Sequence, residues 1–164
     1  MIITKSKLNI NKGAYPEEII NRTGLYYLEK NIGILEKRQI PICILNKTND
    51  KITGKLLSKS SVDYFCFLNN RYSEFEVKQT SNDYFSITQL LAHQMNYLKK
   101  MKNIKINTFL IIYFSKYDTF YIANFEWIIA KTINTTKIKY EEFKNNCQQL
   151  KIIFPGILNI INYL

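Results

Sequence analysis

The sequence predicts a single α/β or α+β domain built around a mixed β-sheet flanked by helices. Its 164 residues are enough for one sizeable hydrophobic core, whereas two domains would each be small. Hydrophobic residues make up 46% of the chain and aromatic residues 14%, which excludes a wholly disordered protein. Helix-like patterns alternate with short apolar runs typical of strands, and this order favours a mixed sheet with helices packed against it.

The first half of the chain contains one expected helix and one expected arm. Pro16 followed by Glu17 and Glu18 is typical of a first helical turn, so we expect a helix over about 15–31. The strand-like run GILEKRQIPICIL follows. Residues 40–60 are polar with turn signals, which predicts a projecting hairpin with a basic face or, alternatively, an ordinary solvated loop. The lysines of this segment recur every four residues, at Lys47, Lys51, Lys55 and Lys59.

The second half supplies the centre of the sheet and three further helices. Ser86 followed by Gln89 is a capping-box pattern ahead of helically spaced apolar residues, so we expect a helix over about 87–102. INTFLIIYFS is typical of a central buried strand, and TFYIANF of the strand beside it. We expect the last two helices over about 125–131 and 140–150.

The charge balance favours a polyanionic partner. Lys and Arg number 23 against 13 Asp and Glu, giving a net charge of +10. Nucleic acid and an anionic membrane are the obvious partners, and a bias unrelated to binding is the alternative. The N-terminus lacks a signal-peptide pattern and no apolar run is long enough to span a bilayer, so we expect a cytoplasmic protein without membrane contact. The three cysteines have no CxxC or neighbouring His, which argues against a zinc site.

The stretch VDYFCFLNNRYSEFEVKQT, residues 62–80, places acids inside an otherwise apolar hairpin. Asn69 and Asn70 tolerate the positive φ of a two-residue type I′ turn. The register set by that turn places Asp63 directly opposite Glu76. Like charges in such a pair are destabilising, so stability alone does not account for them.

A hard cation would reverse the sign of this repulsion. Mg²⁺ suits two carboxylates that leave room for water and a phosphate. Lys78 lies two residues beyond Glu76 on the same face, where it can contact an attacking water or a charged phosphoryl oxygen. The pattern predicts metal-assisted hydrolysis of a phosphodiester. The competing interpretation is a structural ion pair of Asp63 or Glu76 with Lys78.

Four segments occur in a characteristic order along nearly the whole chain, from about Asn11 to the closing INYL: NKGAYPEEIINRTGLYYLEKNIGILEKRQIPI, VDYFCFLNNRYSEFEVKQT, HQM and FLIIYFS. This order resembles the RecU family of Holliday junction resolvases, in the PD-(D/E)xK nuclease superfamily. It implies one nuclease domain over 1–164 with a restriction-endonuclease-like core and a stalk at about 40–60. It also implies a homodimer that cuts four-way DNA junctions with Mg²⁺ or Mn²⁺ in recombination and repair, and that meets a recombinase or branch-migration helicase.

The resemblance assigns metal binding to Asp63 and Glu76 and catalysis to both of them with Lys78. Neighbouring residues depart from the family pattern, since Phe65 and Cys66 stand where Asn and Gly are usual. Positions expected to support the site are Glu17 or Glu18, Ser61 and Gln94. Basic residues expected to contact DNA are Lys12, Lys37, Arg38, Lys47, Lys51, Lys55, Lys59 and Arg71. Two alternatives stay open: a non-catalytic junction-binding recombination modulator, and a nuclease of this fold with another DNA substrate.

Overall fold

The computed structural model describes residues 14–58 and 61–164, so the predicted DNA contacts Lys12 and Lys59 lie outside the described residues. The helices are α1 (Ala14–Glu29), α2 (Ala92–Asn103), α3 (Phe125–Thr132) and α4 (Tyr140–Asn146). The strands of the first half are β1 (Gly33–Lys37), β2 (Ile42–Thr48), β3 (Lys51–Leu56), β4 (Tyr64–Leu68) and β5 (Arg71–Thr80). Those that follow are β6 (Tyr84–Ser86), β7 (Asn107–Phe114), β8 (Thr119–Asn124), β9 (Lys137–Lys139), β10 (Gln148–Leu150), β11 (Ile152–Ile153) and β12 (Ile157–Leu158).

A six-stranded mixed sheet in the order β1-β4-β5-β7-β8-β10 forms the centre of the molecule. The pair β5 and β7 is parallel, and its neighbours pair antiparallel. Residues Phe109 to Phe114 of β7 are all buried, as expected for the run predicted to be the central strand. The predicted mixed sheet flanked by helices is confirmed.

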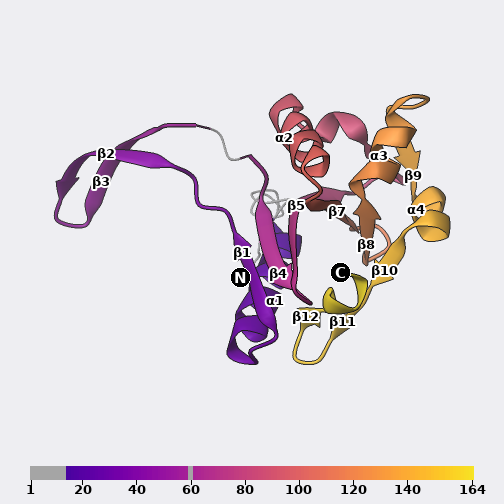
Figure 1. The fold of residues 1–164 in the computed structure, drawn as a ribbon, viewed down its shortest axis with the longest axis horizontal. Coiled ribbons are helices and arrows are strands. Elements are labelled where there is room, and N and C mark those ends of the chain that lie inside the picture. The colour runs from indigo at the N-terminus through magenta and orange to yellow at the C-terminus, as the bar shows by residue number, and fades with distance from the viewer. Residues whose placement is uncertain (1–13, 59–60) are drawn as a thin grey trace, which may run out of the picture.

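The sheet separates two hydrophobic clusters. The helix α1 packs Ile19, Ile20 and Tyr27 onto one face, together with the C-terminal segment. The helices α2, α3 and α4 cover the other face and contribute Leu98, among others, to the second cluster. Figure 1 shows these three helices grouped together and α1 beside β1 and β4. Side chains of alternate residues on each strand therefore reach different cores.

The predicted turn at the tip of the β4–β5 hairpin is present. Asn69 and Asn70 have φ values of 52° and 58°, which only the left-handed region supplies. Leu68 pairs with Arg71, so the register is the one expected from the sequence. The ladder ends at Tyr64, and Asp63 precedes β4 instead of being its first residue.

The strands β2 and β3 form a hairpin that projects from the domain, and we call it the stalk hairpin (Figure 1). Every residue of the two strands is exposed. The prediction that the lysines of the hairpin share one basic face is wrong for Lys47. Lys51 and Lys55 share a face, whereas Lys47 pairs with Ile52 on the other, because side chains alternate along strands and spacing by four is not preserved across a turn.

Two predicted helices differ from the structure at their ends. The helix expected from residue 87 begins at Ala92, because Ile87 to Gln89 form a 3-10 turn and the Gln94 side chain accepts from the Leu91 N–H. The helix expected over 140–150 ends at Asn146, because Gln148–Leu150 pair with β8. Tertiary pairing overrides helical patterning at the end of α4, whereas the later start of α2 has a local cause. Within the described ranges, no helix is long and apolar enough to cross a membrane.

Candidate active site

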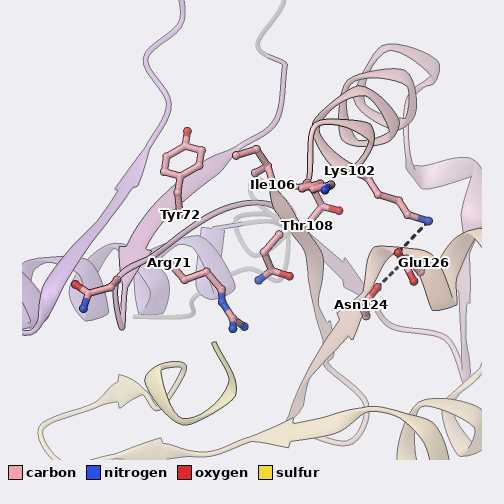
Figure 2. A pocket seen from close by; sticks show the side chains of 10 residues that line it. Arg71, Tyr72, Lys102, Ile106, Thr108, Asn124 and Glu126 are labelled. Atoms are coloured by element: carbon pink, nitrogen blue, oxygen red, sulfur yellow. Dashed lines mark hydrogen bonds and ion pairs between the residues drawn. The ribbon is translucent and has the colours of Figure 1, made fainter.

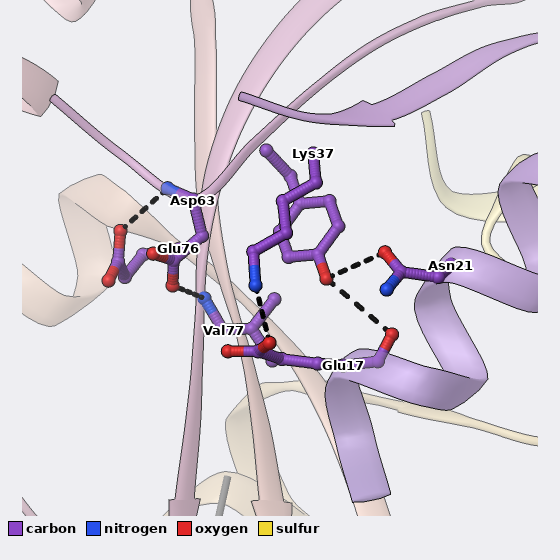
Figure 3. A network of polar contacts seen from close by, with 7 residues as sticks. Glu17, Asn21, Lys37, Asp63, Glu76 and Val77 are labelled. Carbon is purple, nitrogen blue, oxygen red and sulfur yellow. Dashed lines mark hydrogen bonds and ion pairs between the residues drawn. The ribbon is translucent and has the colours of Figure 1, made fainter. Parts of the chain in front are cut away.

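Two carboxylates meet where β4 begins beside the middle of β5. The Asp63 N–H donates to Glu76 Oε2 at 3.1 Å, and the Val77 N–H donates to Asp63 Oδ2 at 3.4 Å (Figure 3). The two acids predicted to face each other are therefore brought together by reciprocal contacts between side chain and backbone. Because the ladder stops at Tyr64, Asp63 is free of strand pairing and turns its carboxylate toward β5.

Glu76 is fully buried, and this burial changes its acidity. The pKa of the Glu76 carboxyl is raised from 4.5 to about 8, first by desolvation and then by hydrogen bonding and charge repulsion from Asp63. Lys78 opposes this effect. A carboxylate in this position is stabilised by added positive charge, so the site favours a cation.

Two further side chains hold Glu76 Oε1. Lys78 Nζ lies 2.5 Å from this oxygen, and the lysine side chain is only 18% exposed. Gln94 Nε2 donates to the same oxygen from α2, and Gln94 Oε1 accepts from the Leu91 N–H at 3.0 Å. Gln94 therefore links the start of α2 to the buried carboxylate.

The donor set fits Mg²⁺ or Mn²⁺ better than zinc. Across residues 14–58 and 61–164, no group of three or more His, Cys, Asp and Glu residues gathers in a geometry that could hold a metal. The carboxylates of Asp63 and Glu76 offer hard oxygen atoms only. Mg²⁺ keeps several waters and needs one or two carboxylates together with substrate phosphates, which matches this pair.

The structure distinguishes Glu17 from Glu18 by their different partners, whereas the sequence cannot distinguish them. Lys37 Nζ lies 2.5 Å from Glu17 Oε2, and Figure 3 shows this pair beside Asp63 and Glu76. Glu17 and Asp63 both raise the pKa of the Tyr64 hydroxyl, after the larger effect of burial. Glu18 instead pairs with Arg22 along the exposed side of α1. Of the two acids, the geometry favours Glu17 as the one that supports the site.

A buried polar cluster next to the site is not predicted from the sequence. Glu74 is 3% exposed at its side chain and pairs with the Arg38 guanidinium, which follows β1. The hydroxyls of Tyr72 and Tyr97 donate to Glu74 Oε1 at 2.8 and 3.0 Å. The Arg38 N–H also donates to the Asp63 carbonyl at 2.8 Å. Alternation along β5 places Glu74 beside the site, but no sequence signal identifies Arg38 as its partner.

Nearly the whole chain matches one protein family. Residues 11–164 match the sequence profile of RecU, recombination protein U. The chain belongs to the RecU family. It is 34% identical over 153 residues to the Holliday junction resolvase RecU of Ureaplasma parvum serovar 3, and the match covers 92% of this chain and 90% of that protein. It is 30% identical over 156 residues to the protein of the same name from Mycoplasmopsis pulmonis, and 94% of each protein is covered.

One solved structure that matches part of the chain is that of Archaeoglobus fulgidus Hjc, a Holliday junction resolvase from an archaeal hyperthermophile. The TM-score is 0.47 at 11% identity, with 79% of this chain and 88% of that chain covered. The RecU resemblance inferred from the sequence is confirmed by the family match.

The other positions predicted for this RecU-family site are dispersed. Ser61 hydrogen-bonds the Tyr97 hydroxyl at the base of the stalk hairpin. Lys37 is engaged by Glu17 and Arg38 by Glu74, so neither side chain is free for a phosphate in this conformation. Arg71 begins β5 and is exposed. The stalk lysines are exposed and lie beyond the sheet, at Lys47, Lys51 and Lys55.

Gln94→Ala is expected to lower the cleavage rate about 10- to 100-fold, because partners that orient a metal ligand have effects of this size. The substitution removes the hydrogen bond from α2 to Glu76, so the Mg²⁺ concentration at half-maximal rate should also rise. The measurement is a Mg²⁺ titration of cleavage. Asn103→Ala, at the exposed end of the same helix, is the matched control and should change neither quantity.

Proposed function

We propose that this protein is a Holliday junction resolvase, a metal-dependent endonuclease that cuts four-way DNA junctions in recombination and repair. The observation that carries the proposal is the meeting of Asp63 and Glu76 beside Lys78 in a chain of the RecU family. Relatives with 34% and 30% identity over nearly the whole chain bear the name Holliday junction resolvase RecU.

Each side chain of the site has a separate task in phosphodiester hydrolysis. Asp63 and Glu76 would hold Mg²⁺ or Mn²⁺, and such an ion activates water and stabilises the charge of the leaving oxygen. Glu76 must release its proton before it can act as a ligand, because the pKa of its carboxyl is raised to about 8. Lys78 orients the water or neutralises charge on the phosphoryl oxygens. Gln94 holds the Glu76 carboxylate in place through its hydrogen bond to Oε1, and Glu17 lies beside the two acids.

We further propose that the protein acts as a homodimer and that the stalk hairpin contacts the DNA. A symmetric junction offers two equivalent cleavage points, so a homodimer with one site per subunit matches it. The exposed lysines Lys51 and Lys55 suit contacts with DNA phosphates at the junction centre. We place the reaction in the cytoplasm, where a recombinase or a branch-migration helicase would act on the same junction.

Replacing Ile42–Leu56 by an Asn-Gly turn is expected to preserve the fold and to remove the preference for junctions. The Leu57 N–H already donates to the Pro41 carbonyl at 3.0 Å, so a short turn can join these residues. The measurement is Mg²⁺-dependent nicking of a synthetic four-way junction and of a linear duplex of equal length. The native chain should cut the junction preferentially.

Two outcomes would contradict this function. Binding of the junction without cleavage under any divalent ion favours the recombination modulator that does not cut DNA. Equal cleavage of junction and linear duplex by the native chain favours a nuclease with another DNA substrate. The intact acidic pair argues against the first, since a protein that only binds DNA gains nothing from carboxylates beside phosphates.

A further inference from the structure

A solvent-open cleft of about 570 Å³ lies at the end of the sheet where β5 and β7 begin. We call it the Arg71 cleft. Its walls come from the first residues of these strands, the segment that follows α2, and the start of α3. Figure 2 shows the Arg71 guanidinium directed into the open space, with Lys102 and Glu126 on the opposite wall. None of the carboxylates of the candidate active site lines it.

The cleft carries unbalanced positive charge. Its cationic groups are Arg71, Lys102 and Lys105, and its one carboxylate is Glu126. Lys102 Nζ pairs with Glu126 Oε1 at 3.0 Å, which cancels one of the three positive charges. Arg71 and Lys105 have no acidic partner among residues 14–58 and 61–164. These two cations therefore remain available to an anion.

Two neutral side chains of the cleft, Asn70 and Asn124, offer hydrogen-bond donors that suit phosphate oxygens. Asn124 Oδ1 accepts from the Glu126 N–H at 2.7 Å, which leaves the Asn124 amide nitrogen as a donor. Asn70 is exposed beside Arg71 and lines the same space. A phosphodiester presents only acceptors and one negative charge, and a guanidinium matches it with two parallel donors.

The position of the Arg71 cleft favours a DNA backbone over a free anion. Arg71 and Glu76 are five residues apart on β5, which corresponds to about 17 Å along a strand, and this odd spacing directs their side chains to opposite faces of β5. That distance equals the axial length of about five base pairs. Tyr72 also lines the cleft and donates to Glu74 Oε1 at 2.8 Å, so a single rigid strand connects the cleft with the site.

We propose that the Arg71 cleft binds a backbone phosphate of the DNA arm whose scissile phosphate lies at Asp63 and Glu76. The inference rests on the nuclease function proposed above. The second contact fixes the arm at two points on one strand, so that an arm must extend about five base pairs beyond the cut to be held. The Arg71 guanidinium supplies two parallel hydrogen-bond donors to the phosphate, and Lys105 with the amide of Asn124 completes the anion site.

The test is the salt dependence of junction binding by the full chain in EDTA, where no cleavage occurs. Arg71→Gln combined with Lys105→Asn should reduce the slope of log affinity against log salt concentration by about 0.9 for each phosphate that is no longer neutralised. Affinity at low salt should fall about tenfold or more. Asparagine is chosen for position 105 because the backbone of Lys105 has a φ of 66°, and asparagine tolerates this left-handed conformation. Thermal unfolding verifies that the variant is folded.

Matched controls make the result decisive. Lys116→Gln with Lys144→Gln removes the same charge from exposed positions that do not line the cleft, and its slope should stay native. An equal slope for cleft variant and native chain overturns the proposal, as does an equal decrease in both variants. The cleft would instead belong to a free anion if two results came together. Inorganic phosphate at low millimolar concentration would compete with junction binding, and the salt slope of the cleft variant would equal that of the native chain.

Arm length gives a second measurement. Junctions whose arms end fewer than about five base pairs from the cut should bind native and variant chains alike, because the Arg71 cleft then has no phosphate to hold. A native chain that cuts no DNA contradicts the nuclease function, while the salt slope still tests the cleft. Normal cleavage with an unchanged slope contradicts the cleft alone.

Discussion

Glu76→Gln is expected to reduce Mg²⁺-dependent junction cleavage about a thousandfold or more and to increase the stability of the metal-free protein at neutral and alkaline pH. Loss of the ligand charge removes several kcal/mol of transition-state stabilisation, and each 1.36 kcal/mol corresponds to a tenfold change in rate. The gain in stability arises because Glu76 is fully buried and Asp63 repels its charged form. The measurements are single-turnover cleavage and thermal unfolding in EDTA.

The pH dependence of stability follows from the raised pKa of Glu76. The unfolded chain releases this proton near pH 4.5, whereas the folded chain retains it until about pH 8. The protonated carboxyl therefore contributes stability that is fully present below pH 4.5 and is lost as the pH rises to about 8. The loss is on the order of a few kcal/mol for the native chain. Glutamine does not titrate, so the variant should lack this part of the slope.

Glu29→Gln is the matched control, because Glu29 is an exposed acid at the end of α1. It should alter neither cleavage nor the pH profile of stability. Retained cleavage in Glu76→Gln, or in Asp63→Asn, would remove these residues from the active site. Identical pH profiles for native and Glu76→Gln chains would show that Glu76 is not the group titrating near pH 8.

Arg38→Ala is expected to lower the free energy of unfolding by about 3–5 kcal/mol, because it leaves the buried Glu74 carboxylate without its counter-charge. Chemical denaturation measures the effect. If Arg38 serves only as a phosphate contact, stability should stay native while DNA affinity falls.

The neighbouring Lys37 provides the matched control for Arg38. Its pair with Glu17 is exposed on both sides, so Lys37→Ala should change stability by less than about 1 kcal/mol. The double variant Arg38→Met with Glu74→Leu removes both charges and should recover most of the stability. Failure of this recovery would mean that Arg38 stabilises the fold through contacts other than Glu74.

Local sequence patterns predict the parts of the site that lie on one hairpin. The Asn69–Asn70 turn fixes the register of β4 and β5, and that register brings Asp63 to Glu76. Period-two alternation places Lys78 on the same face. These features involve residues close in the sequence, so turn chemistry and strand geometry determine them without further information.

Contacts between distant segments are decided only by the tertiary structure. Gln94 reaches Glu76 from α2, and Arg38 reaches Glu74 across 36 residues. The choice of Glu17 over Glu18 depends on how α1 lies against β1. The sequence by itself determined the mixed sheet, the acidic pair, the lysine and the family, because each has a local pattern or a recognisable order. Tertiary packing alone decided which distant partners neutralise and orient the buried carboxylates, because no local spacing encodes a contact between elements.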